Sequence, residues 1–454
     1  MGFRDDFLWG TATAAYQVEG AAKAGGRGYT VWDDFCARPG KVYDGHNGEE
    51  ACDHYRRFRE DVDLMAELGI KSYRFSIAWS RILPDGTGKV NEEGIRFYRE
   101  LMEALLEKNI KPCVTLFHWD LPFALYIRGG WQNPDCVNWF AQYARTVAHA
   151  YRELVSMFIT FNEPQCFVGL GQVTGEHAPG DRLSRRSALL MTHHVMMAHG
   201  AAVQAIRSEI PNASIGYAPT STVACPLDES QENIRLAKEM YFSIPQEEQD
   251  SNYLWSVSMW SDPVLLGRYP QEAYSIYGAD MPDVRPQDLE LMAQPLDFYA
   301  QNIYHGYQVK AGPDGKPVRC DRKQGLPKTC MDWPVMPESL YWGPKFLYER
   351  YHLPIVISEN GMSNPDVICL DGKVHDSYRI DFLNRYLLQL RRAAEDGVDI
   401  RGYYVWSLMD NFEWTKGYSE RFGMVHVDYE TQKRTIKDSG RWYAKVIESR
   451  GTSL

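Results

Sequence analysis

The sequence lacks the features that would place the protein in a membrane or outside the cell. No apolar run approaches the roughly 20 residues of a transmembrane helix, and residues 1–6, MGFRDD, lack the basic-then-apolar order of a signal peptide. The nine cysteines are scattered, odd in number and without a C-x-x-C pair, which favours reduced thiols over a disulfide framework. We therefore expect a soluble, cytoplasmic protein.

A surplus of positive charge is also missing. The chain has 49 Lys and Arg against 60 Asp and Glu, a formal net charge of −11, which argues against nucleic acid or an anionic membrane as the main partner. It has no phosphate-cradling glycine loop, and the spacing of His193, His194 and His199 is not the H-E-x-x-H of a zinc site. We predict no metal and no organic cofactor, and we leave homo-oligomerisation open.

Strand-like and helix-like patterns alternate along the whole chain. Apolar and β-branched runs predict eight strands, at 7–12, 72–77, 113–117, 158–161, 215–218, 298–303, 355–358 and 402–407. Between them, apolar residues recur every three or four positions, as in 52–68, 95–105 and 382–390, which indicates amphipathic helices. The turn-rich segment 311–317, AGPDGKP, predicts a hairpin or surface loop.

This alternation predicts parallel strands joined by helical crossovers. The length of 454 residues fits a barrel with loop insertions, which runs beyond 400 residues, and no Pro/Gly/Ser-rich linker divides the sequence. We therefore expect an α/β fold, a single (β/α)8 TIM barrel with long βα loops, in which residues 1–454 form one domain.

Two short acidic segments each follow a predicted buried strand. They are 160–164, TFNEP, and 357–361, ISENG, and they place Glu163 and Glu359 at strand ends, each beside an asparagine. Cleavage of a glycosidic bond needs one carboxyl group as acid and another as nucleophile or base, so the pair suits that reaction. Taken alone, either glutamate is more simply a surface acid or a helix-cap partner.

In a barrel, residues just past the carboxyl ends of the strands converge on one mouth. Here they are mostly amides, carboxylates and indoles, with one imidazole, which match the hydroxyls and apolar faces of a sugar ring: Gln17, Glu19, Arg74, His118, Trp119, Asp120, Asn162, Glu163, Asn302, Tyr304, Glu359, Asn360, Trp406, Asp410, Asn411, Phe412, Glu413 and Trp414. Structural alternatives stay open for four of them. Arg74 fits a buried ion pair, His118 a satisfied core histidine, and Trp406 and Trp414 plain barrel packing.

Six segments, in chain order, resemble those of family 1 glycoside hydrolases, the β-glucosidase family, over essentially the whole length. They are 7–20 (FLWGTATAAYQVEG), 73–82 (YRFSIAWSRI), 117–120 (FHWD), 160–164, 357–361 and 410–414 (DNFEW). One such segment can arise by chance, whereas six in order make the resemblance specific. It implies the barrel fold and the hydrolysis of β-glycosides.

The resemblance also implies roles for individual residues. Glu359 would be the nucleophile and Glu163 the acid/base. The residues expected to bind the substrate are Gln17, His118, Asn162, Trp406, Glu413, Trp414 and Phe422. Those expected to flank the nucleophile are Arg74, Asn302 and Tyr304, and Trp333 in 332–337, DWPVMP, resembles the platform for the leaving group.

The sequence departs from the family pattern in two places. The usual Asn-Tyr-Tyr is Asn-Ile-Tyr at 302–304, although Tyr304 is retained, and Gln165 stands where many members have tryptophan, followed by Cys166 and Phe167. Because the changes at 165–167 lie toward the leaving-group side, we expect the choice of aglycone to differ most from the family.

We predict a retaining β-glucosidase that hydrolyses terminal non-reducing β-D-glucosyl residues of small β-glucosides or cello-oligosaccharides by double displacement. Arg74 is expected to keep Glu359 ionised, and that charge to raise the pKa of Glu163. Alternatives are a 6-phospho-β-glycosidase, which would need cations where Glu413 and Trp414 stand, and a preference for β-galactosides or β-fucosides. A non-catalytic sugar-binding barrel would be expected to lose one of the two glutamates.

Overall fold

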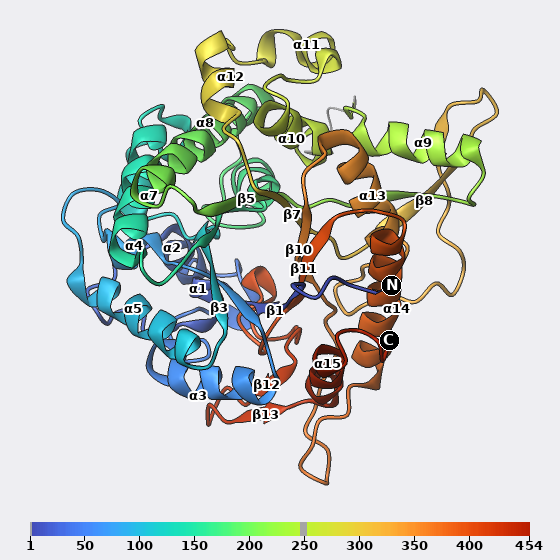
Figure 1. The fold of residues 1–454 in the computed structure, drawn as a ribbon. Coiled ribbons are helices and arrows are strands. Elements are labelled where there is room, and N and C mark those ends of the chain that lie inside the picture. Colours follow the sequence, from blue (N-terminus) through green and yellow to red (C-terminus); the bar gives the residue numbers. More distant parts are fainter. Residues whose placement is uncertain (1, 246–251) are drawn as a thin grey trace.

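The computed structural model describes residues 2–245 and 252–454. Eight parallel strands close into a barrel in the order β1-β11-β10-β7-β5-β4-β3-β2 (Figure 1). Their bounds are β1 Leu8–Ala12, β2 Ser72–Ser76, β3 Lys111–Phe117, β4 Met157–Asn162, β5 Ser214–Ala218, β7 Phe298–Asn302, β10 Ile355–Asn360 and β11 Ile400–Trp406. The predicted fold class and all eight predicted strands are therefore confirmed.

Helices cover the outside of the barrel between successive strands (Figure 1). The long ones are α3 His54–Glu67, α5 Glu92–Glu107, α7 Cys136–Tyr151, α8 Arg185–Glu209, α13 Ser339–Tyr351, α14 Ser377–Glu395 and α15 Asp438–Glu448. The helical patterns at 52–68, 95–105 and 382–390 correspond to α3, α5 and α14. Within the described ranges, no helix is long and apolar enough to span a membrane.

Helix α5 shows how the sequence dictates these elements. Glu92 and Glu93 open it, where the positive end of the helix dipole favours acidic side chains. Phe97, Leu101 and Leu105, spaced by four, are all buried on one face. Burying each such side chain stabilises the fold by about 1.5–3 kcal/mol, so this face fixes the helix on the barrel.

The loops between strands contain further helices and two small sheets. The helices are α1 Ala15–Val18, α2 Val31–Ala37, α4 Trp79–Ile82, α6 Phe123–Tyr126, α9 Gln231–Phe242, α10 Val257–Leu265, α11 Gln271–Tyr277 and α12 Pro286–Met292. The sheets are β6-β8-β9 (Val223–Pro226, Gly306–Ala311, Pro317–Arg319) and β12-β13 (Val425–Val427, Arg434–Ile436). Strands β8 and β9 are antiparallel, so the turn-rich segment 311–317 belongs to a hairpin, one of its two predicted forms.

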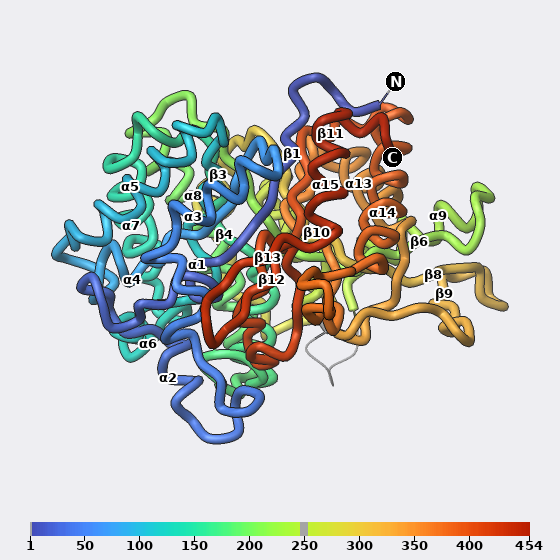
Figure 2. The backbone as a smooth tube through the Cα atoms, turned by 90° about the horizontal axis from the view of Figure 1, so that it is seen from below, coloured from blue at the N-terminus to red at the C-terminus, as the bar shows by residue number. Residues whose placement is uncertain are grey.

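The inside of the barrel is filled by side chains of unequal size. A Cβ atom on Gly10 would lie 2.3 Å from the ring of Tyr404, and one on Gly216 would lie 2.2 Å from the ring of Phe298. Small residues beside large ones let the strands close around a packed core rather than a pore. Figure 2 shows both chain ends at one edge of the barrel, and α2 and α6, which follow β1 and β3, toward the other. The single-domain organisation stays a prediction.

Candidate active site

The carboxyl ends of the barrel strands border a cavity of about 440 Å³. Nine residues with a role implied by the resemblance line it, His118, Glu163, Tyr304, Trp333, Glu359, Trp406, Glu413, Trp414 and Phe422, as does Trp119, which was predicted at the mouth. The other four, Gln17, Arg74, Asn162 and Asn302, lie behind this lining and are hydrogen-bonded to members of it. The structure therefore brings together all thirteen residues to which the family resemblance gives a role.

Glu163 follows the last residue of β4 in an unusual backbone conformation. Its φ is 43°, in the left-handed region that residues other than glycine seldom adopt. Such a conformation costs on the order of 1–3 kcal/mol and persists where the surrounding structure enforces it, most often at functional sites. The backbone N–H of Glu163 donates to the Ala218 carbonyl at 2.8 Å. In the side chain, Oε1 accepts from Asn302 Nδ2 at 2.9 Å and Oε2 from Cys166 Sγ at 3.2 Å.

Glu359 lies within β10, which extends two residues beyond the predicted strand. Its Oε1 accepts from Arg74 Nη1 and its Oε2 from the Tyr304 hydroxyl, both at 2.7 Å. Arg74 is itself buried and also donates through Nε to Thr115 Oγ1 at 3.0 Å. A buried cation needs an anionic partner and further hydrogen bonds to offset its lost hydration, and Arg74 has both here.

The two glutamates form a coupled pair of buried acids. Burial raises the pKa of Glu163, and it raises the pKa of Glu359 to about 7 despite the opposing effect of Arg74. Because both carboxyl groups lie in one low-dielectric site, ionisation of one opposes ionisation of the other. The groups that best stabilise a carboxylate, Arg74 and Tyr304, contact Glu359, whereas Glu163 receives only neutral donors. This asymmetry favours the charge on Glu359 and the proton on Glu163.

Two of the residues expected to bind the sugar each have a buried polar atom without a hydrogen-bond partner in the described part of the protein. Gln17 donates to the Phe412 carbonyl at 2.9 Å, but its Oε1 is unpaired. His118 Nε2 lies 3.1 Å from Asn162 Nδ2, and its Nδ1 is unpaired. Burial lowers the pKa of His118 well below its ordinary value, so the neutral ring accepts at Nε2 and carries its proton on Nδ1. An unpaired acceptor and an unpaired donor here match sugar hydroxyls.

Aromatic rings form the walls of the cavity. Trp406 stacks on the His118 ring with centroids 5.8 Å apart, and Trp414 stacks on Tyr16 at 6.2 Å. Trp333 is tilted against Tyr304, with centroids 5.0 Å apart. These indoles pack against neighbouring rings and also line the cavity. Barrel packing and a place in the sugar site, the two alternatives for Trp406 and Trp414, are therefore compatible. Their faces suit the C–H patches of a sugar.

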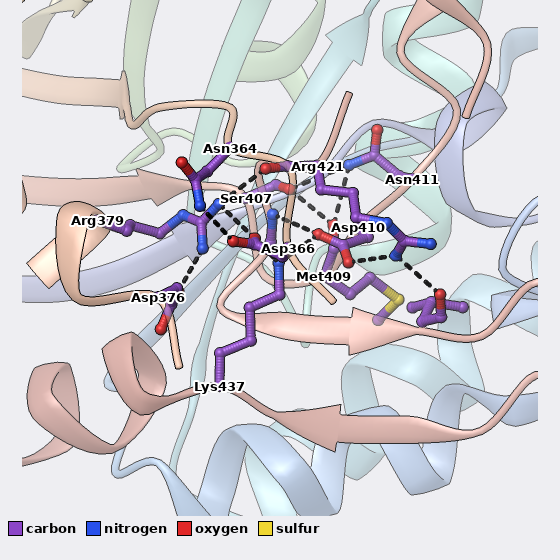
Figure 3. A network of polar contacts seen from close by, with 12 residues as sticks. Asn364, Asp366, Asp376, Arg379, Ser407, Met409, Asp410, Asn411, Arg421 and Lys437 are labelled. Atoms are coloured by element: carbon purple, nitrogen blue, oxygen red, sulfur yellow. Dashed lines mark hydrogen bonds and ion pairs between the residues drawn. The ribbon is translucent and has the colours of Figure 1, made fainter. Parts of the chain in front are cut away.

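The loop after β11 is held from behind by a buried network of charges (Figure 3). The network has three acidic and three basic side chains, so its charges cancel: Asp366, Asp376, Asp410, Arg379, Arg421 and Lys437. Lys437 Nζ donates to Asp366 at 2.5 Å and to Asp410 at 2.6 Å. Asn411, which follows Asp410 in the chain, accepts a hydrogen bond from Gln17 Nε2 at 3.0 Å. The network therefore anchors the segment that positions Gln17.

Several residues predicted at the mouth point elsewhere. Glu19, Asp120, Asn360 and Asp410 are buried outside the cavity lining; Glu19, for example, pairs with Arg81 at 2.6 Å. Gln165, expected on the leaving-group side, does not line the cavity itself, and its influence on the choice of aglycone stays a prediction. Its side chain is buried and donates to the Thr220 carbonyl at 2.9 Å, so it supports a lining residue rather than lining the cavity. His193, His194 and His199 have separate partners in Tyr269, Trp131 and Thr160.

Other lining residues were not predicted. His177 and Trp255 come from long βα loops, where no strand end marks them. His305 also lines the cavity, and its place directly after Tyr304 is a signal that identifies it in retrospect.

Paired carboxyl groups amid amides and indoles, at the carboxyl-end mouth of a (β/α)8 barrel, define a glycoside hydrolase. The chain belongs to glycosyl hydrolase family 1, whose model matches residues 1–452. The resemblance seen in the sequence is thereby confirmed.

Individual relatives match over nearly their whole length. The chain is 42% identical over 450 residues to beta-glucosidase A of Thermotoga maritima, covering 99% of this chain and 98% of the relative. It is also 42% identical to the 1,4-beta-D-glucan glucohydrolase of Thermotoga neapolitana, covering 99% of each. The solved structure of a beta-glucosidase from Thermotoga maritima in complex with glucoimidazole matches with a TM-score of 0.90 and 41% identity, over 99% of both chains.

Proposed function

We propose that the protein is a retaining β-glucosidase that removes terminal non-reducing β-D-glucosyl residues from small β-glucosides or cello-oligosaccharides. The observation that carries this proposal is the asymmetric environment of the two glutamates in one cavity. Glu359 has a cation and a phenol as partners, while Glu163 has an amide and a thiol. The names of the relatives and the glucoimidazole complex support glucose as the sugar.

The first step forms a glycosyl-enzyme. A carboxylate oxygen of Glu359 attacks the anomeric carbon as the bond from that carbon to the leaving oxygen breaks. Glu163 transfers its proton to the leaving oxygen, so the aglycone departs as a neutral alcohol. Once Glu359 is esterified its charge is gone, which lowers the pKa of Glu163 and suits it to act next as a base.

The second step releases the sugar. Glu163 takes a proton from water, whose oxygen bonds to the anomeric carbon as the ester bond to Glu359 breaks. Two inversions at one carbon give net retention, and both glutamates return to their starting protonation states.

The release of 4-nitrophenol from 4-nitrophenyl β-D-glucoside tests this function. We expect turnover by the wild-type protein and none above background by Glu359→Gln. A protein that binds glucosides without releasing the phenol would instead be a sugar-binding barrel.

The rival 6-phospho-β-glycosidase activity is disfavoured by the placement of Arg421. This side chain donates to Asp410 at 2.6 Å and to the Val427 carbonyl at 3.0 Å, so it is engaged away from a sugar phosphate. Lys416 lines the cavity, but Glu413 lines it too. The balance among glucosides, galactosides and fucosides is to be measured with a panel of aryl glycosides.

We further propose a cytoplasmic location. All nine cysteines are free thiols, and Cys330 is exposed. Free thiols persist where the compartment is reducing. Cell fractionation tests this, and activity confined to the extracellular fraction would contradict it.

A further inference from the structure

Cys166 contacts the acid/base side of the site directly. It is the first residue of the wide helical segment η3, Cys166–Thr174, and its backbone N–H donates to the Glu163 carbonyl at 2.9 Å. Its Sγ lies 3.2 Å from Glu163 Oε2, and the side chain lines the cavity although it is largely buried. Among the free cysteines of the described residues, Cys166 alone is hydrogen-bonded to either glutamate.

The two oxygens of Glu163 have different partners. Oε1 accepts from Asn302 Nδ2, which also donates to Asn162 Oδ1 at 2.9 Å. An amide nitrogen only donates hydrogen bonds, so Oε1 is held as an acceptor. The proton that Glu163 must transfer therefore belongs on Oε2, the oxygen beside Cys166.

A thiol suits this position because it serves both protonation states of Glu163. When Glu163 is ionised, the S–H donates to Oε2; when Oε2 is protonated, the sulfur accepts. The thiol itself stays neutral, since burial and the Glu163 charge raise the pKa of Cys166 well above its ordinary value. Both interactions are weak, so neither traps the proton.

We propose that Cys166 is a positioning residue that holds Oε2 of Glu163 in line for proton transfer, both to the leaving group and from the incoming water. The inference rests on the proposed function. The proton leaves Oε2 for the leaving oxygen in the first step and returns from water in the second, and Cys166 neither gains nor loses one.

The other groups around Glu163 stay unchanged in the test. Titratable and charged side chains that face it or share its cavity come from several other parts of the barrel: Arg74 of β2, His118 after β3, Glu176 and His177 in the loop after β4, Tyr304 and His305 after β7, Glu359 of β10, and Glu413 and Lys416 after β11. Thr220 also favours the ionised form of Glu163 through a side-chain hydrogen bond. Replacing Cys166 alters only the donor on Oε2.

The test compares Cys166→Ala and Cys166→Ser in the pH profile of kcat/KM. The basic limb of this profile reports the pKa of the acid/base, Glu163, and the acid limb that of the nucleophile, Glu359. Alanine removes a donor to the ionised form of Glu163, so the basic limb should move to higher pH by roughly half a unit. Serine is a stronger donor, so the limb should move to lower pH. The acid limb should stay in place for both. Alkyl glucosides, whose leaving groups need the proton, should lose roughly tenfold more activity in the alanine variant than 4-nitrophenyl glucoside.

Cys369→Ser, on a partly exposed loop, serves as the control and should leave both limbs at their wild-type positions. If the two Cys166 variants move the basic limb in the same direction, or not at all, Cys166 only packs against Glu163. Should the alanine variant fail to fold, the serine variant decides: a basic limb at or above the wild-type pH overturns the proposal. Absence of wild-type hydrolysis would instead refute the proposed function.

Discussion

Arg74 Nη1 lies 2.7 Å from Glu359 Oε1 inside the barrel, and both side chains are buried. The same guanidinium donates to Asn162 Oδ1, on the residue that precedes Glu163. One cation from β2 therefore links the strand ends that carry the two glutamates. Because it contacts Glu359 directly and Glu163 only through Asn162, it also makes the pair electrostatically unequal.

Replacing Tyr304 with Phe should move the acid limb of the pH profile to higher pH. The hydroxyl donates to Glu359 Oε2 at 2.7 Å, and a donor to the ionised form lowers a carboxyl pKa. Its loss raises that pKa, so a higher pH is needed to ionise the nucleophile. Tyr378→Phe, at an exposed position on α14, is the matched control. An unshifted acid limb in Tyr304→Phe would show that the hydroxyl does not tune Glu359.

Alanine at Glu359 and at Glu163 should have different effects. Without Glu359 no group remains to form the covalent intermediate, so kcat should fall by several orders of magnitude for every substrate. Without Glu163, substrates with poor leaving groups should suffer most, and azide should partly restore turnover by replacing water as the nucleophile. A series of aryl glucosides that differ in phenol pKa measures this, and equal losses across the series in both variants would contradict the assigned roles.

Lys437→Met should destabilise the protein by about 3–5 kcal/mol, because Asp366 and Asp410 would be left buried without this cation. Urea unfolding followed by tryptophan fluorescence measures the change. The exposed Lys433→Met is the control, expected within about 0.5 kcal/mol of wild type. Adding Asp366→Asn to Lys437→Met should recover part of the loss, and equal stability of Lys437→Met and wild type would show that the network contributes nothing.

Discrimination against glucoside 6-phosphates should increase with pH. Burial and the neighbouring carboxyl groups raise the pKa of Glu413 to about 8. As the pH rises past this value Glu413 becomes negatively charged and repels the phosphate of the substrate. We expect kcat/KM for an aryl glucoside 6-phosphate to be at least roughly hundredfold below that of the free glucoside, about 3 kcal/mol of discrimination. Comparable values for the two substrates at pH 8 would refute this.

The barrel was predictable because its signal is local. Each strand is a short run of buried apolar residues, so 355–358 was recognisable as a strand without knowledge of its partners. The end of β10 was harder, since Glu359 and Asn360 are polar yet lie within the strand. Their hydrogen bonds to Arg74, Tyr304 and Tyr403 replace the apolar contacts on which the pattern depends.

The parts of the site that the sequence missed depend on three-dimensional placement. The first turn of η3 directs Cys166 toward Glu163, while Gln165 contacts Thr220; the identities of the residues alone do not distinguish these directions. Lys437 likewise joins Asp366, 71 residues earlier in the chain, and only the folded structure pairs them.

The most direct test of the double displacement is to identify which anomer of glucose the enzyme forms first. Proton NMR of 4-nitrophenyl β-D-glucoside hydrolysis, followed from the first turnovers, distinguishes α-glucose from β-glucose before the two anomers interconvert. Attack by Glu359 followed by water predicts β-glucose first, with α-glucose appearing only as mutarotation proceeds. If α-glucose appears first, water attacks the substrate directly, and the assignment of Glu359 as nucleophile is wrong.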